Sequence, residues 1–278
     1  IKRITQKRWL FTSILALLSA GLILPSLLWS KDSRKFEKLS NELFFSDLSS
    51  NALSLHYTLA YPENYGFSDE IIFSSWQPEK SSEGTDIQEA LDTLSEISAD
   101  KLNENDTYAY KLLYRYLNLR LSGIPYSFYS EPLSPSSGMQ SGLPILLADY
   151  TFRNEKDVED YLHILDQVDT YFDGLIVFEQ EKAEKGLFMS DYAAEEIIKQ
   201  CDAIMDKDAL ASGSHFLHTT FQERVDALER EGIITLEQKN SWVSENDRLL
   251  TTVVAPAYEK LADAFIVLKG SGNNDNGL

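Results

Sequence analysis

Four histidines and one cysteine are the residues of this chain best suited to metal or nucleophilic chemistry. His215 and His218 are three apart on a predicted helix, so both imidazoles could reach one metal ion. The helix of a zinc peptidase instead spaces its histidines four apart and places a glutamate after the first (HExxH). Here the two intervening residues are apolar. We therefore interpret this pair as part of a helix start, and His56 and His163 as packing residues.

Nucleophiles are no better supported by the sequence. Cys201 lies on a helix predicted over residues 191–205 and is interpreted as a small core residue. No serine lies in a GxSxG turn, and Gly213-Ser214-His215 is typical of a helix cap. The chain also lacks a GxxxxGK[ST] phosphate loop.

Carboxylate pairs such as Glu179/Glu181 and Glu195/Glu196 are expected by chance in so acidic a chain. We interpret them as a solvated face rather than as general acid and base. The sequence therefore predicts no catalytic residue, no metal ligand and no cofactor within this chain.

The one stretch with a credible functional role is Tyr126 to Pro144, within a segment from Gly123 to Pro144 that breaks the helical pattern. Four of the eight prolines fall there, so we expect no regular element to run through it. Its aromatic and aliphatic content predicts an ordered connection wrapped on the core, and loops of this kind often line clefts. The predicted substrate-cleft residues are Tyr129, Ser136, Ser137, Gly138 and Gln140. A purely structural wrap would have the same composition.

Apolar residues recur at helical spacing elsewhere, which predicts an all-α fold, an antiparallel bundle of long helices after the N-terminal segment. The predicted helices cover 33–60 (as one or two), 86–99, 104–121, 154–185, 191–205, 214–231 and 235–269. Expected caps are Gly186, Ser190, Ser214 and the capping box Thr235-Leu236-Glu237-Gln238. We expect Gly174 to bend its helix and Pro256 to kink the last one. Tyrosines among leucines predict that helix 104–121 is buried on more than one side.

Residues 1–30 carry four cations and no acid, and an uncharged, largely apolar run extends from Trp9 to Trp29. A run of this length can cross a hydrocarbon core of ~30 Å. No small-x-small cleavage site follows it, so we favour an uncleaved membrane anchor through residues 9–29 over a signal peptide. In either case the basic flank stays in the cytoplasm. Residues 31–278 are then extracytoplasmic, tethered to the cell membrane or, after cleavage, secreted.

After residue 30, 21 basic side chains stand against 44 acidic ones. This surface repels phosphate backbones, which argues against nucleic-acid binding. It also repels anionic lipid headgroups, so we expect the body to stand clear of the membrane. One cysteine cannot form an internal disulfide, and stability must therefore come from a hydrophobic core.

Several blocks of residues, in order along the chain, resemble a known family. The blocks are Leu55–Leu59, Pro62–Gly66, Glu131–Gln140, Leu143–Leu147, Asp157–Leu162, Glu179–Ala183, Gly186–Ser190 and Pro256–Tyr258. Together they resemble the N-terminal half of the bacterial domain-of-unknown-function family 885 (DUF885), from about residue 36 onward.

Members of that family look like distant relatives of zinc metallopeptidases with an all-helical fold. The resemblance implies that the metal-binding helix lies in a C-terminal half, after Leu278, so no catalytic or metal residue is carried over. It also implies zinc as cofactor and a peptide as substrate of the longer protein. We expect residues 31–278 to be the non-catalytic N-terminal portion of a larger peptidase-like domain. The alternative is a membrane-tethered binding or structural module without enzymatic activity.

The anchor hypothesis predicts that the exported protein keeps residues 9–29. Mass spectrometry of the N-terminal peptide from the membrane fraction would then find residues of this run. A mature N-terminus between Ser19 and Lys31 would show that the segment is a cleaved signal.

Overall fold

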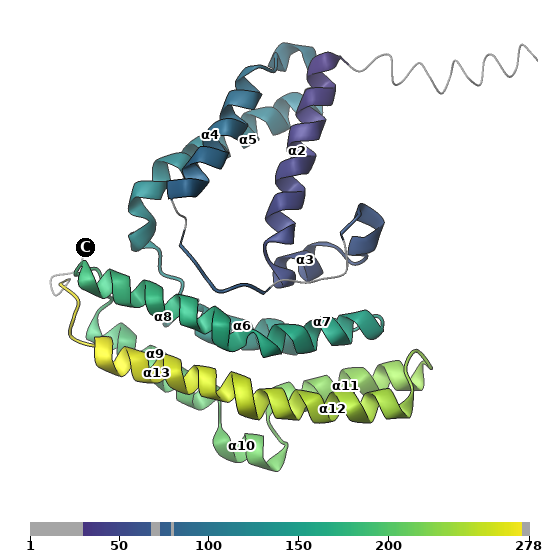
Figure 1. Cartoon of the computed structure of the whole chain (residues 1–278), viewed down its shortest axis with the longest axis vertical. Coiled ribbons are helices and arrows are strands. Elements are labelled where there is room, and N and C mark those ends of the chain that lie inside the picture. Colours follow the sequence, from purple (N-terminus) through teal and green to yellow (C-terminus); the bar gives the residue numbers. More distant parts are fainter. Residues whose placement is uncertain (1–29, 68–72, 79–80, 274–278) are drawn as a thin grey trace, which may run out of the picture. The chain divides into compact units, whose positions relative to one another are not determined.

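The computed structural model describes residues 30–67, 73–78 and 81–273, and in this part the chain forms helices joined by turns, without a strand (Figure 1). The all-α class predicted from the sequence is thereby confirmed. No helix of the described part is both long and apolar enough to cross a bilayer. The predicted anchor, residues 9–29, lies outside the described residues.

The described chain divides into two compact units. Unit 1 comprises the residues up to Phe45 together with Ser81–Ile124, and unit 2 comprises Ser46–Lys80 together with Pro125–Leu278. The elements of unit 1 are α2 (Lys31–Ser49, which continues into unit 2), α4 (Ser81–Ser95), η2 (Ala99–Lys101) and α5 (Glu104–Gly123). Their small core contains Phe36, Leu39, Ile87, Ala90, Leu91, Leu94, Ile97 and Leu117.

Unit 2 contains the longer helices, and their apolar stripes form one continuous core. Helix α13 packs against α8 and α9, while α12 packs against α7 and α11 (Figure 1). The elements are α3 (Ala52–Thr58), η1 (Pro62–Tyr65), η3 (Ile124–Tyr129, which begins in unit 1), α6 (Met139–Ala148), α7 (Glu155–Asp166), α8 (Val168–Glu184), α9 (Asp191–Ile204), α10 (Lys207–Ser212), α11 (Phe216–Arg230), α12 (Leu236–Leu249), η4 (Leu250–Val254) and α13 (Ala255–Leu268).

The helix predicted over residues 154–185 is in fact two helices, and the break is not at Gly174. Gln167 leaves helical geometry with φ −104° and ψ 2°, and its side-chain oxygen accepts the Phe73 N–H at 3.0 Å. Gly174 instead permits a close crossing, because a Cβ there would lie 2.1 Å from the Trp76 carbonyl oxygen. Gln167 thus binds the backbone of Phe73, and Gly174 leaves room for the backbone of Trp76 to pack on α8.

The ends of the helices largely follow the sequence signals. Gly186 takes the left-handed conformation at φ 71°, and the reciprocal capping box of Thr235 and Gln238 is present. Ser190 caps α9 as predicted. The expected cap at Ser214 is wrong, because the His215 side chain accepts the Leu217 N–H and is itself the N-cap of α11.

The last two helices form one continuous rod with a local change of pitch. Residues Leu250–Val254 are π-helical, and the Ala255 N–H donates to the Leu250 carbonyl five residues back. The distortion predicted at Pro256 is therefore realised as a π-segment just before it.

Helix α5 departs from the expectation of burial on more than one side. Leu117 is its only buried residue, while Tyr108, Leu112, Tyr116 and Leu119 are exposed. The tyrosine content was misleading, because the helix packs on unit 1 through a single row of side chains.

A helix does run through the end of the proline-rich segment, which corrects the expectation that no regular element could. Pro144 lies inside α6 and has no N–H to give to the carbonyl of Gln140, four residues earlier. The hydroxyl of the buried Tyr258 donates to that carbonyl instead, at 2.8 Å. A side chain from α13 thus satisfies the backbone acceptor that proline leaves unpaired.

We predict that Tyr258→Phe lowers the free energy of unfolding by roughly 1–2 kcal/mol, since a buried carbonyl loses its donor. In a Pro144→Ala background the cost should be smaller, because the alanine introduced there has an amide that can bond to the Gln140 carbonyl. Urea titration of the four variants of this cycle measures the difference.

The exposed Tyr192→Phe substitution is the matched control and should leave stability unchanged. An equal cost of Tyr258→Phe with and without Pro144 would mean that the hydroxyl does not compensate the proline.

Candidate functional site

The segment Ser130–Gly138, which we call the wrap, is ordered and held against unit 2. The Gly138 N–H donates to the Ser134 carbonyl at 3.0 Å and closes its central turn. Leu133 is fully buried in the core. The sequence prediction of an ordered connection on the core is thus confirmed.

The buried side chain of Gln140 holds the C-terminal part of the wrap by hydrogen bonds. Its fully buried amide nitrogen lies 2.7 Å from the Ser134 carbonyl and 2.8 Å from the side-chain oxygen of Gln200 on α9. Gln200 in turn donates to the Pro135 carbonyl at 2.9 Å. Gly138 is required at this crossing, because a Cβ there would lie 2.2 Å from the Ser134 nitrogen.

Lys182 fastens the other end. This lysine of α8 has no exposed side-chain surface, and its ammonium group lies 3.2 Å from the Ser130 carbonyl and 3.0 Å from the Glu131 carboxylate. A third oxygen, from Glu179 one turn back, is 3.5 Å away. A buried ammonium must find partners for its three protons, and two of these three come from the wrap.

Glu179 is equally buried and is the less satisfied member of this pair. Apart from the Lys182 ammonium group, 3.5 Å from one of them, its carboxylate oxygens have no polar partner among the described residues. Burial raises the pKa of Glu179 to about 7; Lys182 opposes the rise and the charge of Glu131 adds to it. The interpretation of Glu179 as part of a solvated face is wrong, whereas Glu181 is exposed as expected.

The five predicted cleft residues fall into two groups. Tyr129, 62% exposed, is on the surface with Ser136 and Ser137, while Gly138 and Gln140 are buried beneath them. The buried pair fixes the backbone that presents the exposed serines. A substrate-facing role for these residues stays a prediction.

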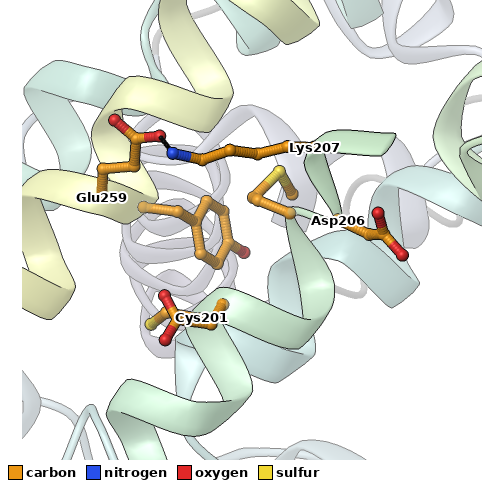
Figure 2. A pocket seen from close by; sticks show the side chains of 7 residues that line it. Cys201, Asp206, Lys207 and Glu259 are labelled. Carbon is orange, nitrogen blue, oxygen red and sulfur yellow. Dashed lines mark ion pairs between the residues drawn. The ribbon is translucent and has the colours of Figure 1, made fainter. Parts of the chain in front are cut away.

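A pocket of about 350 Å³ opens between α9, α10 and α13 (Figure 2). It is lined by Cys201, Asp202, Met205, Asp206, Lys207, Tyr258 and Glu259. Lys207 and Glu259 form an ion pair at 2.7 Å that joins α10 to α13. Since the Tyr258 hydroxyl bonds to Gln140, this pocket shares a residue with the network that holds the wrap.

The one thiol of the pocket is poorly suited to nucleophilic chemistry. Cys201 is buried, and burial raises the pKa of its thiol to about 12, so the reactive thiolate is scarce at neutral pH. This confirms its interpretation as a core residue. Within the described ranges no group of three or more His, Cys, Asp or Glu residues could hold a metal ion.

Three of the four histidines have separate structural partners, whereas His163 is exposed and the packing role predicted for it is wrong. His215 lies 2.7 Å from the Ile204 carbonyl, whereas His218 pairs with Asp247 on α12. His56 stacks on the ring of Tyr150 at 3.5 Å, and its burial lowers its pKa to about 4. The packing role predicted for His56 is therefore confirmed.

Lys182 and Tyr258 are site residues that the sequence reasoning missed. A usable signal existed for the first, because residues 175, 179 and 182 continue the apolar spacing of α8 and the last two are charged. A charged residue at a stripe position predicts a buried ion pair. Tyr258 gave no such signal, because its partner is a backbone atom distant in sequence.

One protein-family model, "Bacterial protein of unknown function (DUF885)", matches residues 73–275. The chain belongs to this family. The resemblance seen in the ordered blocks is thus confirmed at the level of the family, and no curated protein matches the chain.

Among solved structures, the chain is similar to "the putative lipoprotein from Colwellia psychrerythraea", with a TM-score of 0.66 and 16% identity. The likeness covers 87% of this chain and 42% of that one. At this identity it shows a shared fold alone. The chain thus spans less than half the length of that neighbour in fold.

We predict that Glu179→Gln changes how stability depends on pH. The folded state holds a proton on Glu179 more tightly than the unfolded state, so this group's stabilising contribution is lost as pH rises from 4.5 to about 7. The wild type should lose roughly 3 kcal/mol relative to Glu179→Gln over that range. Urea titrations at several pH values measure it.

Glu181→Gln, on the exposed side of the same helix, is the control and should follow the wild type. If Glu179→Gln also follows the wild type, the carboxyl is not desolvated as described.

Proposed function

We propose that this chain is the non-catalytic N-terminal helical part of an exported, membrane-tethered protein related to zinc metallopeptidases. In the intact protein the exposed side of the wrap, with Ser136 and Ser137, and the adjacent Tyr129 form one wall of a peptide-binding cleft. The body stands on the extracytoplasmic side of the membrane.

The fastening of the wrap by buried polar groups is the observation that carries this proposal. Removing the Lys182 ammonium group from water costs several kcal/mol, which an apolar side chain would avoid. The amine is used to fix the backbone of Ser130 and the carboxylate of Glu131. Preorganised surfaces of this kind are typical of binding sites, since a fixed backbone loses little entropy when a ligand binds.

The tether is supported by the sequence of residues 9–29 and by the neighbour in fold, which is described as a lipoprotein. A lipoprotein is attached to a membrane by its N-terminal end, and an anchor helix would do the same here. The two means of attachment differ. A lipoprotein signal needs a cysteine just after its apolar run, and the only cysteine of this chain is Cys201.

The residues at hand do not fit a zinc site. His215 and His218 are each committed to a different partner, and the described part offers no triad of ligands. Any zinc chemistry would use residues of the longer protein, and none of its steps is assigned to this chain.

We predict that the chain itself does not hydrolyse peptides, with or without a chelator such as EDTA. The reading frame should continue past the codon for Leu278 into a HExxH-type helix. Chelator-sensitive hydrolysis by the purified chain would contradict the proposal. A stop codon directly after Leu278 would favour a tethered binding module instead.

In the product of the longer frame, Tyr129→Ala should raise the KM for peptides about tenfold, as expected for loss of one well-packed aromatic contact. Tyr192→Ala, at another exposed tyrosine on α9, is the matched control. Equal KM values for both variants would show that Tyr129, beside the wrap, does not contact the peptide.

A further inference from the structure

Helix α5 carries two rows of large side chains on opposite sides. The row that faces unit 1 includes Tyr110, Leu113, Leu117 and Leu121. The outward row, which we call the α5 face, repeats at i, i+4, i+7 and i+11 and includes Tyr108, Leu112, Arg115 and Leu119, with Tyr116 beside it. Tyr108, Leu112, Tyr116 and Leu119 are 66%, 51%, 52% and 68% exposed.

Beyond its first turn, the charge of α5 is opposite to that of the chain as a whole. Residues 107–130 contain Lys111, Arg115 and Arg120 and no acid, in a chain whose net charge is −19, whereas the exposed Glu104 begins the outward row one turn before Tyr108. Arg115 within the outward row and Lys111 beside it are both exposed. The expected repulsion between this acidic protein and anionic lipids is therefore weaker over the part of this face that follows Glu104.

The N-terminal end of α5 lies close in the structure to Ser30, the first described residue after the predicted anchor, and α2 contacts α5 on the row opposite the α5 face. The Ser30 hydroxyl donates to the Lys101 carbonyl at 3.3 Å, three residues before α5 begins. The rings of Phe36 and Tyr110 are in contact, with centroids 6.1 Å apart. The first turns of α2, which follow residues 9–29 directly, thus pack against the first turns of α5.

Tyrosine, leucine and cationic side chains on one helix face are the composition that favours the interface of a bilayer. Tyrosine places its ring among the acyl chains and its hydroxyl at the headgroups. Each lysine or arginine near an anionic surface adds about 1 kcal/mol of attraction. Leu112 and Leu119 supply the apolar part.

We propose that the α5 face lies on the membrane that anchors residues 9–29 and contacts its anionic headgroups. This inference rests on the membrane tether of the proposed function. It makes unit 1 a second, peripheral contact with the bilayer, close to the point where the chain leaves it.

The test uses the full chain in vesicles of phosphatidylethanolamine and phosphatidylglycerol. Leu112→Cys or Leu119→Cys carries an environment-sensitive fluorophore, and Glu89→Cys on the exposed side of α4 is the matched control in the same unit. The buried Cys201 is shielded from labelling. A nitroxide attached to the lipid headgroup should quench the labels at 112 and 119 at least about twofold more than the label at 89.

Lys111→Glu together with Arg115→Glu should abolish most of that difference, as should phosphatidylcholine in place of phosphatidylglycerol. Equal quenching at positions 112 and 89 would overturn the proposal. A blue shift at 112 without quenching by the lipid nitroxide would mean that protein covers the face, and it would overturn the proposal as well.

Flotation separates this inference from the tether. Chain that floats with the vesicles, with the label at 112 unquenched, keeps the tether and rejects the α5 contact. Chain that does not float rejects the tether and, with it, this inference.

Discussion

Lys182 places a charged amine where no water reaches it, and much of unit 2 is arranged around that constraint. A buried ammonium is tolerated only when oxygens surround it. Two of its three oxygens belong to Ser130 and Glu131, so the lysine is satisfied only when the wrap is in place. Packing of α8 and folding of the wrap are therefore coupled. A purely apolar contact between them would couple the two less strictly, because it does not depend on the direction of individual bonds.

The need to pair buried polar groups also explains the hydrogen bonds at the opposite end of the wrap. Pro144 removes an amide from α6, and the freed carbonyl of Gln140 is taken by Tyr258 from α13. The Gln140 side chain then reaches back to Ser134 and across to Gln200. Pro144 thus accounts for the hydrogen bond between α6 and α13, and the side chain of the same Gln140 connects α6 to α9 and to the wrap.

Sequence reasoning recovered the elements whose signals are local. The capping box at Thr235, the left-handed Gly186 and the apolar stripes depend on neighbours within a few residues, and each was found where expected. The break at Gln167 was missed because its cause is a distant backbone amide, that of Phe73. The prediction that α5 is buried on two sides was wrong, because the composition of a helix does not show whether another element packs on its second apolar face.

The candidate site was predictable only in part for the same reason. Proline and glycine marked the wrap, but the residues that hold it come from α8, α9 and α13, far away in sequence. Glu179 was assigned to the surface because acidic residues usually are solvated, and only its spacing on the stripe of α8 pointed the other way. Hydrogen exchange at the amides of Gly138 and Met139, which bond to Ser134 and Pro132, tests the central claim most directly. Exchange as slow as in α8 is predicted, and exchange at the rate of an unstructured peptide while α8 stays protected would contradict a wrap built into the core.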